Sequence, residues 1–88
     1  MILSKIEIHK YDENYIKENY LGKNFLANIN IIIDHDMVIN NIKLMNGLKG
    51  KYLKFPEDDK GRNIAYPIKE ETRQFILNEI LNKYEEEN

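Results

Sequence analysis

The run FLANINIII at residues 25–33 constrains the fold of this 88-residue chain more than any other segment. Its apolar positions on one expected face are Phe25, Ala27, Ile29, Ile31 and Ile33. Asn28 and Asn30 alternate with them and belong to the other face. A period of two built largely from β-branched side chains predicts a strand with one buried face. Such a strand needs neighbouring strands and an apolar cover.

Neighbouring segments predict those strands. Residues 2–10 alternate, as do residues 37–45, and residues 49–55 form a shorter strand that Pro56 ends. The expected inward positions are Ile2, Ile6 and Ile8 in the first of these strands, and Val38, Ile42 and Leu44 in the second. Residues 34–36 (DHD) and 46–47 (NG) are turn signals. Residues 11–24 are compatible with a long hairpin excursion or a short helical turn.

A helix is expected at about residues 69–84, because Thr72, Ile76, Ile80 and Tyr84 recur every four positions. Phe75, Leu77 and Leu81 widen this apolar stripe. Strands followed by one helix predict a single α+β domain over residues 1–88, with an antiparallel sheet of about four strands packed against a C-terminal amphipathic helix. The expected shared core comprises Ile29, Ile31, Val38, Ile42, Ile76 and Ile80.

Composition narrows the classes of function. The chain has no cysteine, which excludes disulfides and thiolate metal sites, and agrees with a cytoplasmic location. It has no apolar run long enough to span a bilayer, so no membrane association is expected. The net charge is −2, divided into +2 over residues 1–56 and −4 over residues 57–88. So small a domain without disulfides is expected to gain stability as a homodimer.

Motifs for catalysis are absent from the sequence. No serine or threonine follows the spacing of a nucleophile elbow, and the glycines do not form a phosphate loop. Residues 34–36 are interpreted as a polar turn and not as a metal site, because adjacent strand residues point in opposite directions. Tyr52 and Phe55 are expected on opposite strand faces, which differs from the paired aromatics of an RNA-recognition motif. The sequence therefore predicts a binding protein without catalytic residues, metal or cofactor.

Four segments resemble the SpoVG (stage V sporulation protein G, septation protein) family of bacteria. Residues 33–43 (IDHDMVINNIK) resemble the family's LDHEFVVHDIR, and residues 45–56 resemble its IDG…GLFVAMPS. Residues 62–68 (RNIAYPI) are similar to the family's RDIAHPI, and Thr72-Arg73 stands at its TR. The family's basic loop is replaced here by the shorter, acidic residues 57–61 (EDDKG).

The resemblance implies a dimeric α+β protein that binds DNA and RNA and regulates sporulation, septation and cell division without a cofactor. The matching arginines Arg62 and Arg73 are candidate phosphate ligands, because arginine binds phosphate through two parallel hydrogen bonds. Lys51, Lys54 and Lys69 are further candidates on charge and neighbourhood. Both arginines could instead be structural, with Arg62 paired to an acid such as Asp59 and Arg73 to Glu70. The alternative function is a protein-binding adaptor that contacts division or regulatory proteins.

Overall fold

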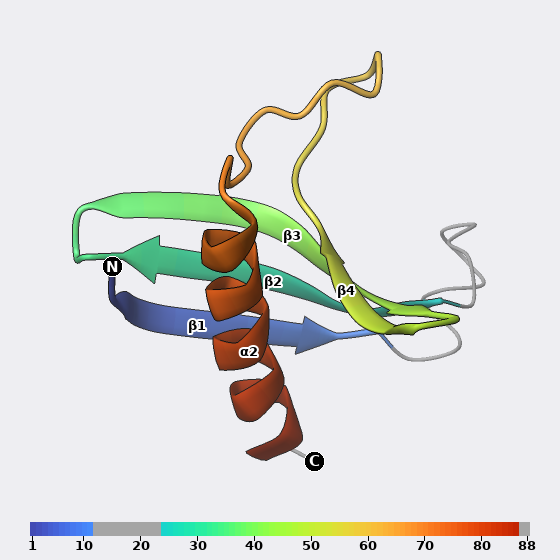
Figure 1. Ribbon diagram of the computed structural model, residues 1–88, viewed down its shortest axis with the longest axis horizontal. Helices are drawn as coiled ribbons and strands as arrows, with labels where there is room; N and C mark the ends of the chain where they lie inside the picture. Colours follow the sequence, from blue (N-terminus) through green and yellow to red (C-terminus); the bar gives the residue numbers. More distant parts are fainter. Residues whose placement is uncertain (12–23, 87–88) are drawn as a thin grey trace.

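In a computed structural model, residues 1–11 and 24–86 form a four-stranded antiparallel sheet and one helix (Figure 1). The elements are β1 (Leu3–Lys10), β2 (Phe25–Ile33), β3 (Met37–Gly47), β4 (Gly50–Lys54) and α2 (Glu70–Glu86). The strands lie in the order β1-β2-β3-β4, so each pairs with its neighbour in sequence. The predicted α+β fold is confirmed. Most of the segment whose structure the sequence left open, residues 12–23, lies outside the described residues.

Helix α2 crosses one face of the sheet, and the core lies between them (Figure 1). Ile76 and Ile80 are the helix residues buried there, four positions apart and therefore on the same side of the helix. They pack in one cluster with apolar side chains of β2, β3, β4 and the residue after β4: Ala27, Ile29, Ile31, Ile42, Leu44, Leu53 and Phe55. Five of the six expected core residues are therefore buried. Phe75 belongs to the expected stripe but remains 36% exposed.

Val38 is the exception, and a β-bulge explains it. Ile31 of β2 pairs with Ile39, whereas Ile29 pairs with Ile42, so β3 contains one extra residue between these pairs. Asn41 has a φ of 64°, a left-handed conformation that asparagine tolerates better than most residues, and its N–H donates to Asn30 Oδ1 at 3.0 Å. The extra residue reverses the alternation of β3. Ile39 consequently packs against the core, and Val38 is 57% exposed.

Two further irregularities correct the expected faces of β1 and β2. The register shifts between Leu3 and Lys5, so Leu3 packs on the core in place of Ile2, which is 67% exposed. The register also shifts between Phe25 and Ala27, which turns Phe25 away from the helix. A displacement by one residue moves a strand side chain to the opposite face of the sheet. Alternation alone therefore placed Ile2 and Phe25 on the wrong face.

The Asp34-His35-Asp36 segment forms the β2–β3 turn, as the sequence predicts. Asp34 and His35 have φ values of 52° and 54°, the left-handed pair of a tight hairpin. The Asp34 carboxylate accepts a hydrogen bond from the N–H of Ile2 at 2.7 Å, and Ser4 Oγ accepts one from the N–H of His35 at 2.8 Å. These groups tie the turn to β1. Within the described residues, no helix is both long and apolar enough to cross a membrane.

We expect Ile31→Ala and Ile80→Ala each to lower the free energy of unfolding by ~2–5 kcal/mol, because both side chains are fully buried. Val38→Ala is the matched control, since it also truncates a β-branched residue of the sheet but at an exposed position. It should change stability by no more than ~0.5 kcal/mol. Urea denaturation measures all three. Equal losses for Val38 and Ile31 would contradict the assignment of faces.

Candidate functional site

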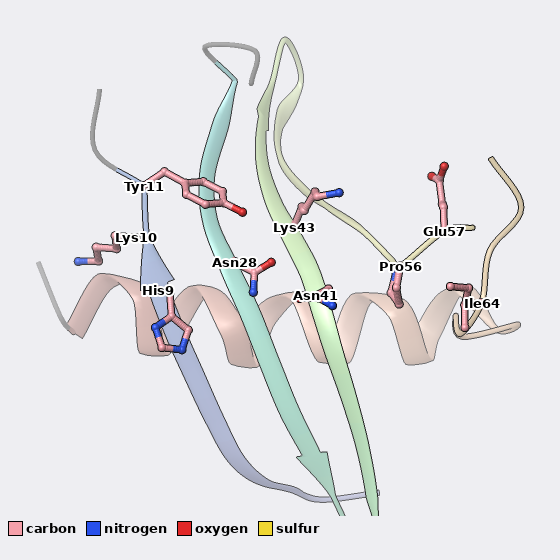
Figure 2. Close-up of a pocket in the computed structure, with 9 residues that line it drawn as sticks. All are labelled: His9, Lys10, Tyr11, Asn28, Asn41, Lys43, Pro56, Glu57 and Ile64. Atoms are coloured by element: carbon pink, nitrogen blue, oxygen red, sulfur yellow. The ribbon is translucent and has the colours of Figure 1, made fainter. Parts of the chain in front are cut away.

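The face of the sheet opposite α2 carries a row of polar side chains that crosses all four strands. His9 of β1 pairs with Asn28 of β2, Asn28 pairs with Lys43 of β3, and Lys43 pairs with Lys54 of β4. Directly paired residues share a face, so these four side chains lie on the same side of the sheet. Figure 2 shows His9, Asn28 and Lys43 on this side, with α2 behind the strands. We call this surface the open face.

A shallow hollow of about 660 Å³ lies on the open face, between the sheet and the chain that follows β4 (Figure 2). The residues that line it are His9, Lys10, Tyr11, Asn28, Asn41, Lys43, Pro56, Glu57 and Ile64. Its floor offers two side-chain amides, Asn28 and Asn41, which both donate and accept hydrogen bonds. Its walls include an aromatic ring, Tyr11, and an aliphatic side chain, Ile64. The hollow therefore combines an aromatic ring, an aliphatic side chain and two amides with the charged side chains of Lys10, Lys43 and Glu57.

Aromatic side chains gather at one end of the open face. The rings of Tyr11 and Phe25 pack edge to face, with 6.0 Å between their centroids. Lys43 Nζ lies 5.9 Å from the centroid of the Phe25 ring. Tyr52 of β4 pairs with Met45, which pairs with Phe25, so Tyr52 extends the same row and is 46% exposed. A Cβ at Gly47 would lie 2.9 Å from the Tyr52 ring. The absence of a side chain at Gly47 therefore lets this ring lie against the hairpin.

Lys43 and Lys54 are a like-charged pair in directly opposite positions, an arrangement that destabilises a sheet. The ion pairs among the described residues are Lys5–Glu7 at 3.8 Å, His9–Glu7 at 4.0 Å and Arg62–Asp58 at 2.9 Å, so neither lysine is neutralised within this part of the chain. The repulsion would be relieved by an anion bound between them. The open face thus has a local positive charge although the whole chain is acidic.

Lys54 is the one predicted site residue that lies on the open face. Lys51 pairs with Asn46 near the β3–β4 turn, and its odd spacing from Lys54 directs it to the other face of β4. Lys69 precedes α2, where its carbonyl accepts the N–H of Arg73 at 3.1 Å. These three lysines are therefore not gathered into one site.

Arg62 belongs to a small turn organised by Asp58, at the tip of the connector between β4 and α2. The Asp58 carboxylate accepts hydrogen bonds from the N–H groups of Lys60 and Arg62 and from Arg62 Nε, each at 2.9 Å. Gly61 completes the turn with a φ of 78°. The anticipated ion pair of Arg62 is present, but its partner is Asp58 and not Asp59. The backbone hydrogen bond from Arg62, followed by those from Lys60 and the Arg62 side chain, holds the pKa of Asp58 below its ordinary value despite an opposing desolvation effect.

Arg73 lies on the helix side of the molecule. The centre of its guanidinium group is 5.2 Å from the centroid of the Phe55 ring, and Phe55 is 4% exposed. A cation–π contact of this kind stabilises a fold by about 0.5–2 kcal/mol. Arg73 therefore has a partner within the chain, as the structural interpretation expected. The partner is the Phe55 ring and not Glu70. Arg62 and Arg73 remain predicted phosphate ligands, each already engaged within the chain.

Sequence reasoning missed Lys43, His9 and Asn28 as candidate residues. The alternation of the sequence correctly assigned His9 and Asn28 to outward positions. This was the only sign in the sequence that they could belong to a surface site. Their alignment with Lys43 and Lys54 depends on the register of three strand pairs, and two of these contain register shifts. Among the residues that the structure describes, no three His, Asp or Glu side chains are placed to hold a metal ion.

These features define a class of protein: a small α+β domain in which one helix covers one sheet face, while the other presents amides, aromatic rings and lysines. The chain belongs to the SpoVG family, whose family model matches residues 1–86. It is 40% identical to a protein of Agathobacter rectalis over 69% of this chain and 75% of that protein. It is 35% identical to one of Acetivibrio thermocellus over 97% of this chain and 86% of that protein. Both relatives carry the name septation protein SpoVG.

The lowered pKa of Asp58 predicts an acid-sensitive turn. A carboxylate whose pKa is lower in the folded protein stabilises the fold above its unfolded pKa, and this contribution is lost as the pH falls through the folded pKa. NMR titration of the Asp58 carboxyl carbon should give a midpoint below the ordinary aspartate value. In Arg62→Ala the midpoint should rise only slightly, because the backbone donors remain. An ordinary midpoint in the unmodified protein would contradict the geometry of this turn.

Proposed function

We propose that this protein is a nucleic-acid-binding regulator of septation, sporulation and cell division, which acts as a cytoplasmic homodimer and without catalysis. The observation that carries the proposal is the unneutralised Lys43–Lys54 pair on the open face. Phosphate oxygens spaced along a DNA or RNA strand would neutralise both lysines at once. Membership of the SpoVG family and the septation names of the relatives support the biological role.

The charge distribution predicts weak to moderate affinity. Residues 57–88 carry a net charge of −4, and Glu57 lines the hollow on the open face. A phosphate backbone therefore has a restricted path over the cations of β3 and β4. Contacts with few phosphates give a shallow dependence of affinity on salt, with a slope of about −0.9 per phosphate on duplex DNA and about −0.7 on a single strand.

The test compares two charge-matched double variants. Lys43→Gln with Lys54→Gln removes both lysines of the row and should reduce the salt slope by about 1.4 on a single strand, with a corresponding loss of affinity. Lys49→Gln with Lys60→Gln removes the same charge outside the row and should leave the slope nearly unchanged. Fluorescence anisotropy at several salt concentrations measures both.

A third variant, Arg62→Ala with Arg73→Ala, distinguishes the two candidate surfaces. If the open face is the binding site, this variant should keep most of its affinity for nucleic acid. Thermal melting curves show whether the two substitutions have also destabilised the fold. If this variant abolishes binding in the folded protein while the Lys43–Lys54 variant binds normally, the arginines are the phosphate ligands and the open face is not the site.

The proposed homodimer uses the connector between β4 and α2. Ile68 and Tyr66 are 86% and 50% exposed in this connector. Figure 1 shows the connector extending away from the sheet before it returns to α2. Large apolar side chains grouped on one extended segment are typical of a surface covered by another chain. A second copy is the occupant we propose, because it would cover the same segment of both subunits symmetrically.

Sedimentation at micromolar concentration should therefore give twice the monomer mass of 10.5 kDa. Ile68→Asp should shift the protein to monomer, because a carboxylate would be buried without a partner in the interface. Val38→Asp, a substitution at another exposed apolar position, is the control and should remain dimeric. A monomeric parent would contradict the homodimer and would favour the alternative, in which the connector binds a division or regulatory protein.

A further inference from the structure

The hollow on the open face is lined by two lysines, Lys10 and Lys43, and also by groups that suit a planar base. Glu57 lies on its rim, and a carboxylate repels a phosphate that approaches it. The Asn28 and Asn41 amides on the floor bear no charge and offer both donors and acceptors. Tyr11 supplies an aromatic face (Figure 2). The hollow measures about 660 Å³, within the usual range of small-molecule sites, and so has room for a nucleobase with its sugar.

The cations of β3 and β4 extend from the lining of the hollow to its side. Lys43 contributes to its lining and also belongs to the row that continues to Lys54 on β4. A strand whose base enters the hollow would carry its adjoining phosphates over these two lysines. Beyond them, the 46% exposed ring of Tyr52 offers a second surface on which a neighbouring base can stack. The open face thus places phosphate contacts next to base contacts.

We propose that the open face selects single-stranded DNA or RNA by taking one unstacked base into the hollow. This inference rests on the proposed function. In a duplex, each base is stacked and paired, so neither its faces nor its pairing edge can reach Tyr11 or the two amides. In a single strand they can, because the bases are free to turn outward. Selectivity for single strands follows from the hollow, whereas affinity for phosphate follows from the lysines.

Substitutions that remove the Asn28 and Asn41 amides must not disturb the backbone conformation at the β-bulge. Asn41 has a φ of 64° and its N–H is bonded to Asn30, so alanine there would be strained for reasons unrelated to binding. Asn41→Gly removes the amide while keeping this conformation accessible. Asn28 has no such restriction, and Asn28→Ala is the direct truncation. Asn82→Ala on α2 removes the same group from an exposed position of the helix and serves as the matched control.

The experiment measures the affinity of the full chain for a short single-stranded oligonucleotide and for the duplex of the same sequence, at equal salt. The unmodified protein should bind the single strand at least about tenfold more tightly, the effect of one stacked base. Tyr11→Leu should lose this preference, and Asn28→Ala should weaken single-strand binding about three- to tenfold. Asn82→Ala should change nothing. Parallel titrations with RNA of the same sequence show which sugar is preferred.

Each outcome separates the two claims. Equal affinity for single strand and duplex, with both reduced by Lys43→Gln and Lys54→Gln, would overturn the single-strand inference and leave nucleic-acid binding intact. Absence of binding to either form would overturn both. Glu57→Lys provides an independent check: it should strengthen duplex binding more than single-strand binding, because it adds a phosphate contact where the base would enter. If Glu57→Lys increases the preference for single strands, the hollow is not a base site.

Discussion

The contact between the buried isoleucines of α2 and those of β2 and β3 is the interaction on which the rest of the structure depends. Ile76 and Ile80 are 2% and 0% exposed, and they pack with Ile29, Ile31 and Ile42. The chain has one helix in its described residues, and its apolar stripe covers one face of the sheet. The other face consequently carries side chains that tolerate water. These isoleucines therefore decide which face of the sheet the helix covers, and so also which face stays open.

The fold was predictable because its elements have strong periodicities. The isoleucines of β2 specify the central strand, and Ile76 and Ile80 specify the inner side of α2. Individual faces were harder to predict, because three register shifts each displace the alternation by one residue. Val38, Ile2 and Phe25 all lie beside such shifts. The adjacent asparagines at positions 40 and 41 were a weak signal of the β3 bulge, since asparagine tolerates left-handed backbone conformations.

The candidate site was less predictable, because it depends on contacts between distant residues. The family resemblance suggested Arg62 and Arg73, but the structure gives Arg62 an Asp58 partner and Arg73 the Phe55 ring. Local charge suggested Lys54, but its opposition to Lys43 emerges only from the register of β3 and β4. In the sequence alone, the acidic Glu57 is unfavourable to nucleic-acid binding. Glu57 lies on the rim of the hollow, where on our proposal its carboxylate would repel a phosphate on that side and leave the space to a base.

The most direct test of the open face as the binding site is an NMR titration of the isotopically labelled protein with a single-stranded oligonucleotide. Side-chain amide signals are the best probes, because each reports on one side of the sheet. The account predicts that the Asn28 and Asn41 side-chain signals shift as the oligonucleotide is added, while that of Asn82 on α2 stays in place. Shifts confined to residues near Arg62 and Arg73, with unchanged Asn28 and Asn41 signals, would contradict it.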